Sequence, residues 1–262
     1  MKIQFYKYQG TGNDFIIIDN RMINWAPTVQ QVSGLCDRRF GIGADGLMLL
    51  NEKPGFSFTM AYYNSDGHES TMCGNGGRCM TAFARSLGLV GSTAQFWAID
   101  GRHEAEINES PSRLYRLKMK DTWIDKVFAD GFFLNTGSPH FVKFITGVAQ
   151  VDVVAEGRVL RNDERFAPGG TNVDFVEVLD EEIFVRTYER GVENETLSCG
   201  TGVTASAIVS AFRNPDHPGT YNIKTPGGSL KVNFIQQGDI FSDIWLEGPA
   251  EFVFAGEVEV AR

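Results

Sequence analysis

The sequence has few cysteines: only Cys36, Cys73, Cys79 and Cys199 occur in 262 residues. Four scattered cysteines are too few for a disulfide-stapled scaffold, so we expect free thiols in a reducing compartment, with a cytoplasmic location. No window approaches the roughly 20 apolar residues of a membrane-spanning helix. The opening MKIQFYKYQG also lacks the apolar core and small-residue cleavage site of a signal peptide. A membrane partner is therefore not expected.

Basic residues are also in deficit. Lys and Arg number 24 against 33 Asp and Glu, which gives a formal net charge of −9. An acidic chain repels phosphate backbones and anionic surfaces, so nucleic acid is not expected as a partner. The apolar fraction of 42% excludes a disordered chain. The length suits one large domain or two of about 130 residues.

The pattern of predicted elements indicates an α+β fold. We expect helices over residues 27–39, 76–88, 146–155 and 201–213, among many short strands. The first strands are 2–9 and 15–18, joined by a glycine turn, and further strands follow throughout the chain. Few helices among many strands do not fit strict β-α-β alternation.

Glycine is abundant, with 29 residues, and two glycine-rich turns reveal an internal repeat. The segment Cys73-Gly74-Asn75-Gly76 matches Cys199-Gly200-Thr201-Gly202, which lies 126 residues further on. Each turn leads into a helix of small and apolar residues and then into a strand pair. The chain therefore reads as two copies of one fold, with the boundary near residue 117.

The helix after the second turn carries no charged residue before Arg213. A helix without a charged face is normally enclosed by protein. We therefore expect each half to be a sheet curled around one central helix.

A cysteine and two glycines at the start of a buried helix can form a reactive anion site. First-turn N–H groups and the helix dipole attract a carboxylate, and a cysteine there can have its pKa lowered from about 8.5 to roughly 3.5–7.5. Two such turns that face one ligand would favour removal of a proton from the carbon next to its carboxylate. One thiolate would take the proton and the opposite thiol would supply another, inverting the carbon. This chemistry needs no metal or organic cofactor.

Several cysteine, glycine and charged motifs of this sequence also have interpretations that involve no catalysis. Cys36 and Cys79 lie inside helical patterns and read as core residues. The cysteine spacing has no matching histidine pair for a metal site. Residues 41–46 match G-x-G-x-x-G, but a strand follows them where a dinucleotide site needs a helix. On spacing alone, Glu189 and Arg190 could equally be a solvated ion pair.

These motifs together resemble the diaminopimelate epimerase family over essentially the whole chain. The resemblance is carried by residues 10–15, 37–46, 64–67, 73–76, 139–140, 172, 188–191 and 199–202. It implies two similar domains, each a barrel-like, mostly antiparallel sheet around a central helix, with residues 1–117 and 250–262 in the first and 118–249 in the second. It also implies a cofactor-independent isomerase that converts LL- to meso-2,6-diaminopimelate in lysine and peptidoglycan precursor synthesis. As a separate expectation, the chain forms a homodimer.

The resemblance further assigns roles to individual residues. Cys73 and Cys199 would be the two bases, assisted by His140 and Glu189. The backbone amides that would hold the reacting carboxylate are those of Gly74, Asn75, Gly200 and Thr201. The side chains that would read the rest of the substrate are those of Asn13, Asn64, Asn172 and Arg190.

One residue departs from the family pattern: Ser138 stands where the family usually has asparagine, which affects substrate contacts rather than chemistry. Two alternatives remain open at this point. A proline or hydroxyproline racemase-type enzyme would usually carry Cys-Gly-His at the first turn, where this chain has Cys-Gly-Asn. A non-catalytic amino-acid binding protein could use the helix ends as a carboxylate clamp, but it would not need both thiols.

Overall fold

The computed structural model describes residues 1–108, 113–217 and 219–260. The chain divides into two compact units, which we describe separately. Unit 1 comprises Met1–Leu117 and Gly248–Arg262, and unit 2 comprises Lys118–Glu247. The family resemblance predicted that the second boundary would lie two residues later, and the last two residues of the predicted C-terminal segment lie outside the described part.

Unit 1 is built on eight strands that pair in the order β18-β1-β2-β3-β4-β6-β7-β8. Pairs β2–β3 and β4–β6 are parallel and the others are antiparallel. A short strand, β5, extends β4. The bounds are β1 Lys2–Gly10, β2 Asn13–Asp19, β3 Gly46–Asn51, β4 Phe58–Asn64, β5 Glu69–Ser70, β6 Thr93–Ala98, β7 Gly101–Asn108, β8 Leu114–Lys118 and β18 Glu251–Glu259.

Unit 2 is a closed barrel of eight strands in the order β9-β10-β11-β12-β13-β15-β16-β17. It closes because β17 also pairs with β9. Pairs β11–β12 and β13–β15 are parallel. The bounds are β9 Thr122–Phe128, β10 Gly131–Asn135, β11 Pro139–Phe144, β12 Asn172–Val178, β13 Ile183–Glu189, β14 Asn194–Thr196, β15 Thr220–Thr225, β16 Gly228–Gln237 and β17 Ile240–Pro249.

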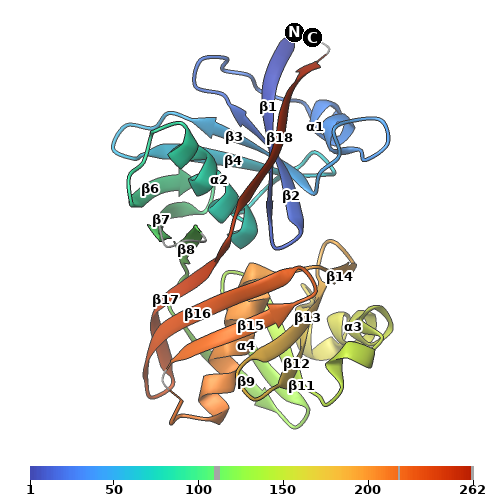
Figure 1. Cartoon of the computed structure of the whole chain (residues 1–262). Coiled ribbons are helices and arrows are strands. Elements are labelled where there is room, and N and C mark those ends of the chain that lie inside the picture. The colour runs from blue at the N-terminus through green and yellow to red at the C-terminus, as the bar shows by residue number, and fades with distance from the viewer. Residues whose placement is uncertain (109–112, 218, 261–262) are drawn as a thin grey trace. The chain divides into compact units, whose positions relative to one another are not determined.

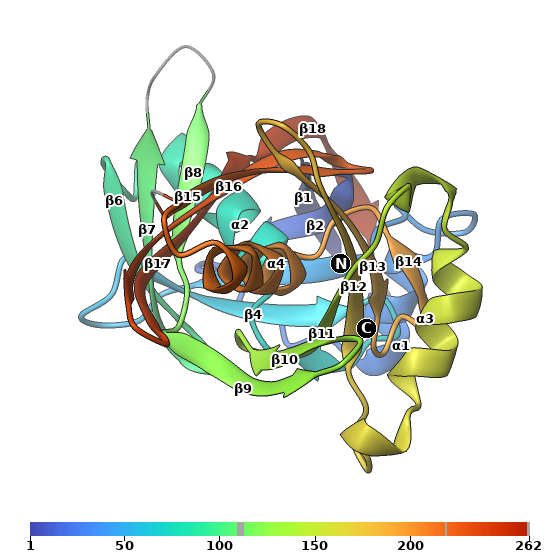
Figure 2. The ribbon, with the colours of Figure 1, turned by 90° about the horizontal axis from the view of Figure 1, so that it is seen from below.

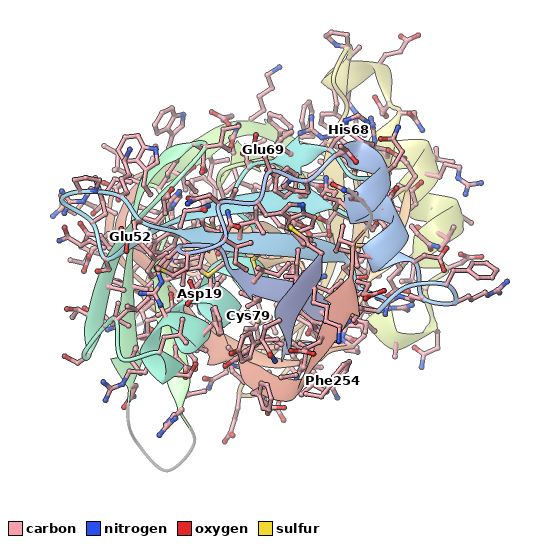
Figure 3. The ribbon with its side chains drawn as sticks, turned by 90° about the horizontal axis from the view of Figure 1, so that it is seen from above. Asp19, Glu52, His68, Glu69, Cys79 and Phe254 are labelled. Atoms are coloured by element: carbon pink, nitrogen blue, oxygen red, sulfur yellow. The ribbon has the colours of Figure 1, made fainter. Side chains whose placement is uncertain are left out.

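The two units have the same strand order and the same two parallel pairs, which explains the sequence repeat. Only the source of one strand differs. In unit 2 the strand beside β10 is β9, the preceding segment of the chain. In unit 1 the equivalent place beside β1 is taken by β18, from the C-terminal end (Figure 1). There Phe254, which is labelled in Figure 3, packs edge-to-face on Phe5 with ring centroids 5.8 Å apart.

Each unit contains the expected buried helix. These are α2, Gly74–Ser86, in unit 1 and α4, Gly200–Arg213, in unit 2. Figure 2 shows α4 surrounded by the strands of its unit. Ala205, Ile208 and Val209 are completely buried. An enclosed helix has no face for charged side chains, so it is built from small and apolar residues. The predicted α+β fold with a central helix in each half is confirmed.

The other helices lie outside the sheets and cross over between parallel strands. Helix α1, Val29–Cys36, connects β2 to β3 and begins at a capping box formed by Thr28 and Gln31. Helix α3, Val153–Arg161, connects β11 to β12. Between β11 and β12 also lie the short 3₁₀ turns η1, Val148–Gln150, and η2, Glu164–Phe166. Among the described residues, no helix is both long and apolar enough to cross a membrane.

Two sequence-based expectations were wrong in this region. The helix expected over 146–155 is displaced, because Gly147 has a left-handed backbone and the Asp152 side chain caps a helix that starts at Val153. Strand β9 was not expected, because four of its seven residues are exposed and its sequence lacks a strict alternation.

Packing of α3 on the barrel gives a test of the fold. A Cβ atom at Gly157 would lie 2.4 Å from Cβ of the fully buried Tyr188. We expect Gly157→Ala to lower the free energy of unfolding by about 1–3 kcal/mol through overpacking. Gly34→Ala in α1 is the matched control, because nothing lies within 4 Å of that Cβ position. It should stabilise the protein by roughly 0.5–1 kcal/mol. Urea denaturation of both variants checks this, and equal effects would contradict the packing.

Candidate active site

Cys73 and Cys199 occupy the same structural position, the residue that precedes the buried helix of each unit. Both have extended backbones, and neither side chain caps its helix. Their carbonyl groups accept the first helical bonds, from Gly77 at 2.7 Å and from Val203 at 2.9 Å. The first-turn N–H groups of a helix have no acceptor inside the helix, so each turn is suited to bind an anion beside a thiol.

In unit 1 the thiol of Cys73 contacts Asn13 of β2. The Sγ atom donates to Asn13 Oδ1 at 3.6 Å, and Nδ2 of the buried Asn75 approaches the same oxygen at 3.5 Å. The orientation of the Asn13 amide is set by its other atom, Nδ2, which donates to Asp45 Oδ2 at 2.5 Å. The structure thus brings together Asn13, Cys73 and Asn75, and we call these with Gly74 the N-terminal cluster.

Asp45 is held by a group of charged residues. Arg38 bridges Asp14 and Asp45, with 2.7 Å to each carboxylate, and Lys7 contacts Asp14 at 2.7 Å. Burial alone would raise the pKa of Asp14, but the hydrogen bonds and charges of Arg38 and Lys7 outweigh it and lower the pKa to about 2. The Asp14 carboxylate therefore stays ionised near neutral pH and holds Arg38, which also contacts Asp45 beside Asn13.

Asn64 is the predicted residue least engaged with this cluster. It is exposed at the end of β4, where its backbone N–H donates to the His68 carbonyl. The next residue, Ser65, donates its N–H to the Asp45 carbonyl at 3.1 Å. The turn therefore lies beside Asp45, and so near Asn13.

A fully buried arginine lies one turn further along α2. Arg78 Nη2 donates to Asn75 Oδ1 at 3.0 Å and to Thr11 Oγ1 at 3.3 Å, and Nε donates to the Pro249 carbonyl. Nη1 is buried without a hydrogen-bond partner among the described residues. Burial lowers the pKa of Arg78. Sequence reasoning missed this residue because an arginine in a helix normally predicts an exposed face.

In unit 2 the histidine predicted to assist catalysis lies behind the helix start. His140 of β11 is completely buried, and its Nδ1 atom is 2.7 Å from Asp174 Oδ2 of β12, which is also completely buried. Its Nε2 atom lies 2.9 Å from Thr201 Oγ1 and 3.0 Å from Ser138 Oγ. Thr201 Oγ1 in turn lies 3.4 Å from Cys199 Sγ.

Two other predicted residues of unit 2 are joined through the backbone. Asn172 Oδ1 accepts the N–H of Arg190 at 2.8 Å, and the guanidinium of Arg190 reaches the Gly169 carbonyl at 3.4 Å. Glu189 accepts from Thr196 Oγ1 at 3.0 Å. Glu189 and Arg190 thus have separate partners here. We call His140, Asn172, Glu189, Arg190 and residues 199–201 the C-terminal cluster.

The expectation of a lowered thiol pKa is wrong for Cys199. Burial raises its pKa well above the ordinary value, and the negative charges of Glu189 and Asp174 raise it further. The helix start cannot compensate for two nearby carboxylates. At neutral pH the favoured form of Cys199 is therefore the thiol.

The remaining motifs are structural. Cys36 and Cys79 are buried, and burial raises the pKa of both, that of Cys36 to about 12. None of the four cysteines forms a disulfide. Residues 41–45 form a loop that leads into β3, so the G-x-G-x-x-G match belongs to a turn. The described residues hold no group of three or more histidine, cysteine or acidic side chains arranged as a metal site.

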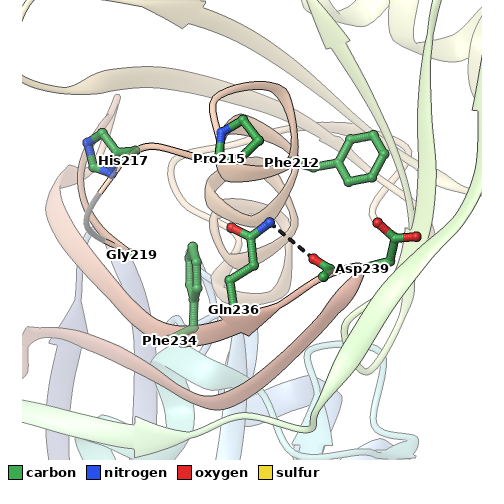
Figure 4. Close-up of a pocket in the computed structure, with 8 residues that line it drawn as sticks. Phe212, Pro215, His217, Gly219, Phe234, Gln236 and Asp239 are labelled. Atoms are coloured by element: carbon green, nitrogen blue, oxygen red, sulfur yellow. Dashed lines mark hydrogen bonds between the residues drawn. The ribbon is translucent and has the colours of Figure 1, made fainter.

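A cavity of about 540 Å³ lies at the other end of α4 from Cys199 (Figure 4). Phe212, His217, Phe234 and Asp239 are among its lining residues. None of the predicted site residues lines it, so we do not assign the reaction to it.

Comparison with known proteins identifies the family. The sequence model for diaminopimelate epimerase matches residues 5–119 and 132–253. The diaminopimelate epimerase of Flavobacterium psychrophilum is 49% identical over 96% of this chain and 98% of that protein. That of Chlorobaculum tepidum is 40% identical over 95% of this chain and 98% of that protein. The chain belongs to the diaminopimelate epimerase family.

Solved structures of other proteins have a fold similar to that of this chain. A PhzF-family phenazine biosynthesis protein from Bacillus anthracis matches with a TM-score of 0.78 at 14% identity, over 99% of this chain and all of that one. A hydroxyproline epimerase from Agrobacterium vitis matches with a TM-score of 0.75 at 13% identity, over 98% and 92%. At such low identity these structures show that the fold is shared and nothing more.

Sequence reasoning did not single out Asp45, Arg78 or Asp174. Asp45 lies in a motif that we interpreted as a turn. Asp174 lies among apolar residues in the strand Asn172–Val178. A carboxylate at such a position could have been recognised from the sequence as a functional candidate. Charged side chains are rarely buried without a partner, so an aspartate inside a predicted core strand indicates a buried cation or donor.

The charged group around Asp14 predicts how acid affects stability. The Asp14 carboxylate binds protons more weakly in the folded chain than in the unfolded chain. Its contribution to the free energy of unfolding is therefore present above pH 4 and is lost as the pH falls towards 2. We expect a loss of about 2 kcal/mol over that range. Urea unfolding at several pH values should show this fall in the native chain and a flatter profile in Asp14→Asn. Asp125→Asn, at an exposed carboxylate of β9, is the control; parallel profiles for all three chains would refute the assignment.

Proposed function

We propose that this chain catalyses the cofactor-independent epimerisation of LL-2,6-diaminopimelate to meso-2,6-diaminopimelate, a step in lysine and peptidoglycan precursor synthesis. Family membership over nearly the full chain supports the reaction and the substrate. The observation that carries the mechanism is the equivalent placement of Cys73 and Cys199 at the starts of α2 and α4.

In this proposal the two thiols work on opposite faces of one α-carbon. A thiolate on one face removes the α-proton, and a thiol on the other face donates a proton to the carbanion. The charge that develops spreads into the α-carboxylate. There the first-turn amides of Gly74, Asn75, Gly200 and Thr201 would stabilise it with preorganised N–H groups. Swapping the charge states of the two sulfur atoms runs the reaction in reverse.

The remaining residues of both clusters, together with Asn64, would bind and orient the substrate. His140 and Glu189 would assist at the reacting centre. Asn13, Asn64, Asn172 and Arg190 would contact the distal amino-acid end, where guanidinium and amide groups match a carboxylate. The fold is shared with a hydroxyproline epimerase, but the identity of 13% gives no support to that substrate.

Isotope exchange tests the reaction directly. The protein is incubated with LL-diaminopimelate in D₂O, without added metal or pyridoxal phosphate, and deuterium at the α-carbon is followed by NMR. We expect incorporation together with formation of the meso isomer. Absence of both would reject the proposed substrate.

Cysteine variants test the two bases. Cys73→Ala and Cys199→Ala should each lower epimerisation by at least about 10³-fold, since each removes one obligatory proton carrier. Cys36→Ala, a buried cysteine packed in the core of unit 1, is the control and should keep most of the activity. Near-normal turnover in either of the first two variants would contradict the two-base mechanism.

We also propose that the enzyme works in the cytoplasm, where a reducing environment keeps its few cysteines as thiols, and that it forms a homodimer. Sedimentation equilibrium of the purified chain should give twice the mass of 29.0 kDa. A monomer at micromolar concentration would exclude a stable dimer.

A further inference from the structure

Arg78 of α2 is a cation that unit 1 buries completely. The groups that accept its hydrogen bonds are all neutral: Asn75 Oδ1, Thr11 Oγ1 and the Pro249 carbonyl. Within the described part of the chain no carboxylate contacts it, and its Nη1 atom has no hydrogen-bond partner. Burial of a charge is costly unless an opposite charge balances it. The packing of unit 1 therefore does not account for an arginine at this position.

The opposite charges that can reach Arg78 within the described residues are those of two thiols. Burial lowers the pKa of Arg78, whereas negative charges on Cys79 and Cys73 would raise it. Cys79 does not supply such a charge, because burial raises the pKa of its thiol and keeps it neutral near pH 7. The anions left to balance Arg78 are a thiolate at Cys73 and a carboxylate bound at the start of α2.

Arg78 also determines which way the Asn75 amide points. The two residues are three positions apart in one helix, so their side chains lie on the same face. A guanidinium can only donate, so the Asn75 atom 3.0 Å from Nη2 is the oxygen Oδ1. The Nδ2 atom is thereby directed to Asn13 Oδ1, at 3.5 Å. That oxygen also accepts from the Cys73 thiol at 3.6 Å. Arg78 thus fixes the donor that shares an acceptor with the reactive thiol.

The turn before Asn13 contacts the same guanidinium. Thr11 has a left-handed backbone with a φ of 50°, which a β-branched residue rarely adopts. Its buried hydroxyl accepts from Arg78 Nη2 at 3.3 Å and donates to Asn75 Oδ1 at 3.5 Å. A strained backbone persists only where its surroundings hold it. Arg78 therefore holds both the Thr11 turn and the Asn75 amide.

We propose that Arg78 is a positioning residue for the proposed reaction. It orients the Asn75 amide and the Thr11 turn around Cys73, and its unbalanced positive charge prepares the start of α2 for the carboxylate of the substrate. Burial serves this role, because a charge away from water is weakly screened. This inference deepens the proposed function and rests on it, because it concerns how one half of the site receives the substrate.

Alkylation of Cys73 measures the effect of this charge without any substrate. Iodoacetate and iodoacetamide react with the same sulfur, but only iodoacetate carries a carboxylate. The ratio of the two rates reports the preference of the site for an anion, because the fraction of thiolate cancels. Cys199→Ser is the parent chain, and mass spectrometry of the Cys73 peptide gives each rate at low salt.

Neutral variants of Arg78 should lose the preference for iodoacetate. Arg78→Met should lower the ratio of the iodoacetate rate to the iodoacetamide rate about fivefold, since it removes one weakly screened charge. Arg78→Gln should do the same, and it takes the place of Arg78→Met if that variant does not fold, because its amide still donates to the neighbouring acceptors. Arg78→Lys keeps the charge and should stay within about twofold of the parent.

Arg85→Met is the matched control, because it removes a like charge from the last turn of the same helix. Its ratio should equal that of the parent chain. An unchanged ratio in the neutral Arg78 variants would overturn the proposal, as would an equal fall in Arg78→Lys or in Arg85→Met.

A double-substitution cycle tests the orientation of Asn75. A lysine has a compact ammonium in place of the planar fork, so it cannot make the same set of contacts. Arg78→Lys should therefore lower kcat about tenfold, with a smaller change in KM. In an Asn75→Ala chain the same substitution should change kcat by less than about twofold, because the amide that Arg78 positions is absent. Equal losses in both chains, or a native kcat in Arg78→Lys, would overturn the positioning role.

The proposed function and the role of Arg78 can fail separately. The alkylation ratio needs neither substrate nor turnover, so it still tests Arg78 if LL-diaminopimelate is not epimerised. Epimerisation by the native chain, together with an unchanged alkylation ratio in the neutral Arg78 variants, would reject the role of Arg78 alone.

Discussion

The burial of a helix start inside each unit is the constraint on which the site depends. A helix enclosed by a sheet cannot carry charge along its sides, and α4 accordingly has none before Arg213. Its first turn nevertheless presents N–H groups with no acceptor in the helix. Neither cysteine side chain caps those groups. The same packing that stabilises the core thus creates a polar site at one end of it.

The two units repeat this arrangement but differ in the charges around it. In unit 1, Cys73 contacts Asn13, which Asp45 and the neighbouring charged residues hold, and the buried guanidinium of Arg78 contacts Asn75. In unit 2, Cys199 is near Glu189 and the His140–Asp174 pair. The repeated backbone therefore places different charged and polar groups beside two structurally equivalent sulfur atoms.

The chain order also shapes the fold. Strand β18, from the C-terminal end, occupies in unit 1 the place that β9 occupies in unit 2. Periodicity could predict most strands and both buried helices, because their apolar faces are regular. It could not predict β9, whose exposed residues leave no pattern, or the start of α3, which depends on the Asp152 cap.

The sequence by itself determined the α+β class, the repeat, the two cysteine turns and, through resemblance, the family. The turns and the helical stripes are local patterns, and the repeat and the resemblance follow from the order of such patterns along the chain. The tertiary structure decided that His140 meets Asp174, that Thr201 lies between His140 and Cys199, and that burial raises the pKa of Cys199. These depend on neighbouring strands and on the depth of burial, because the energy of a charge or a proton depends on its surroundings in space and not on its neighbours in the chain.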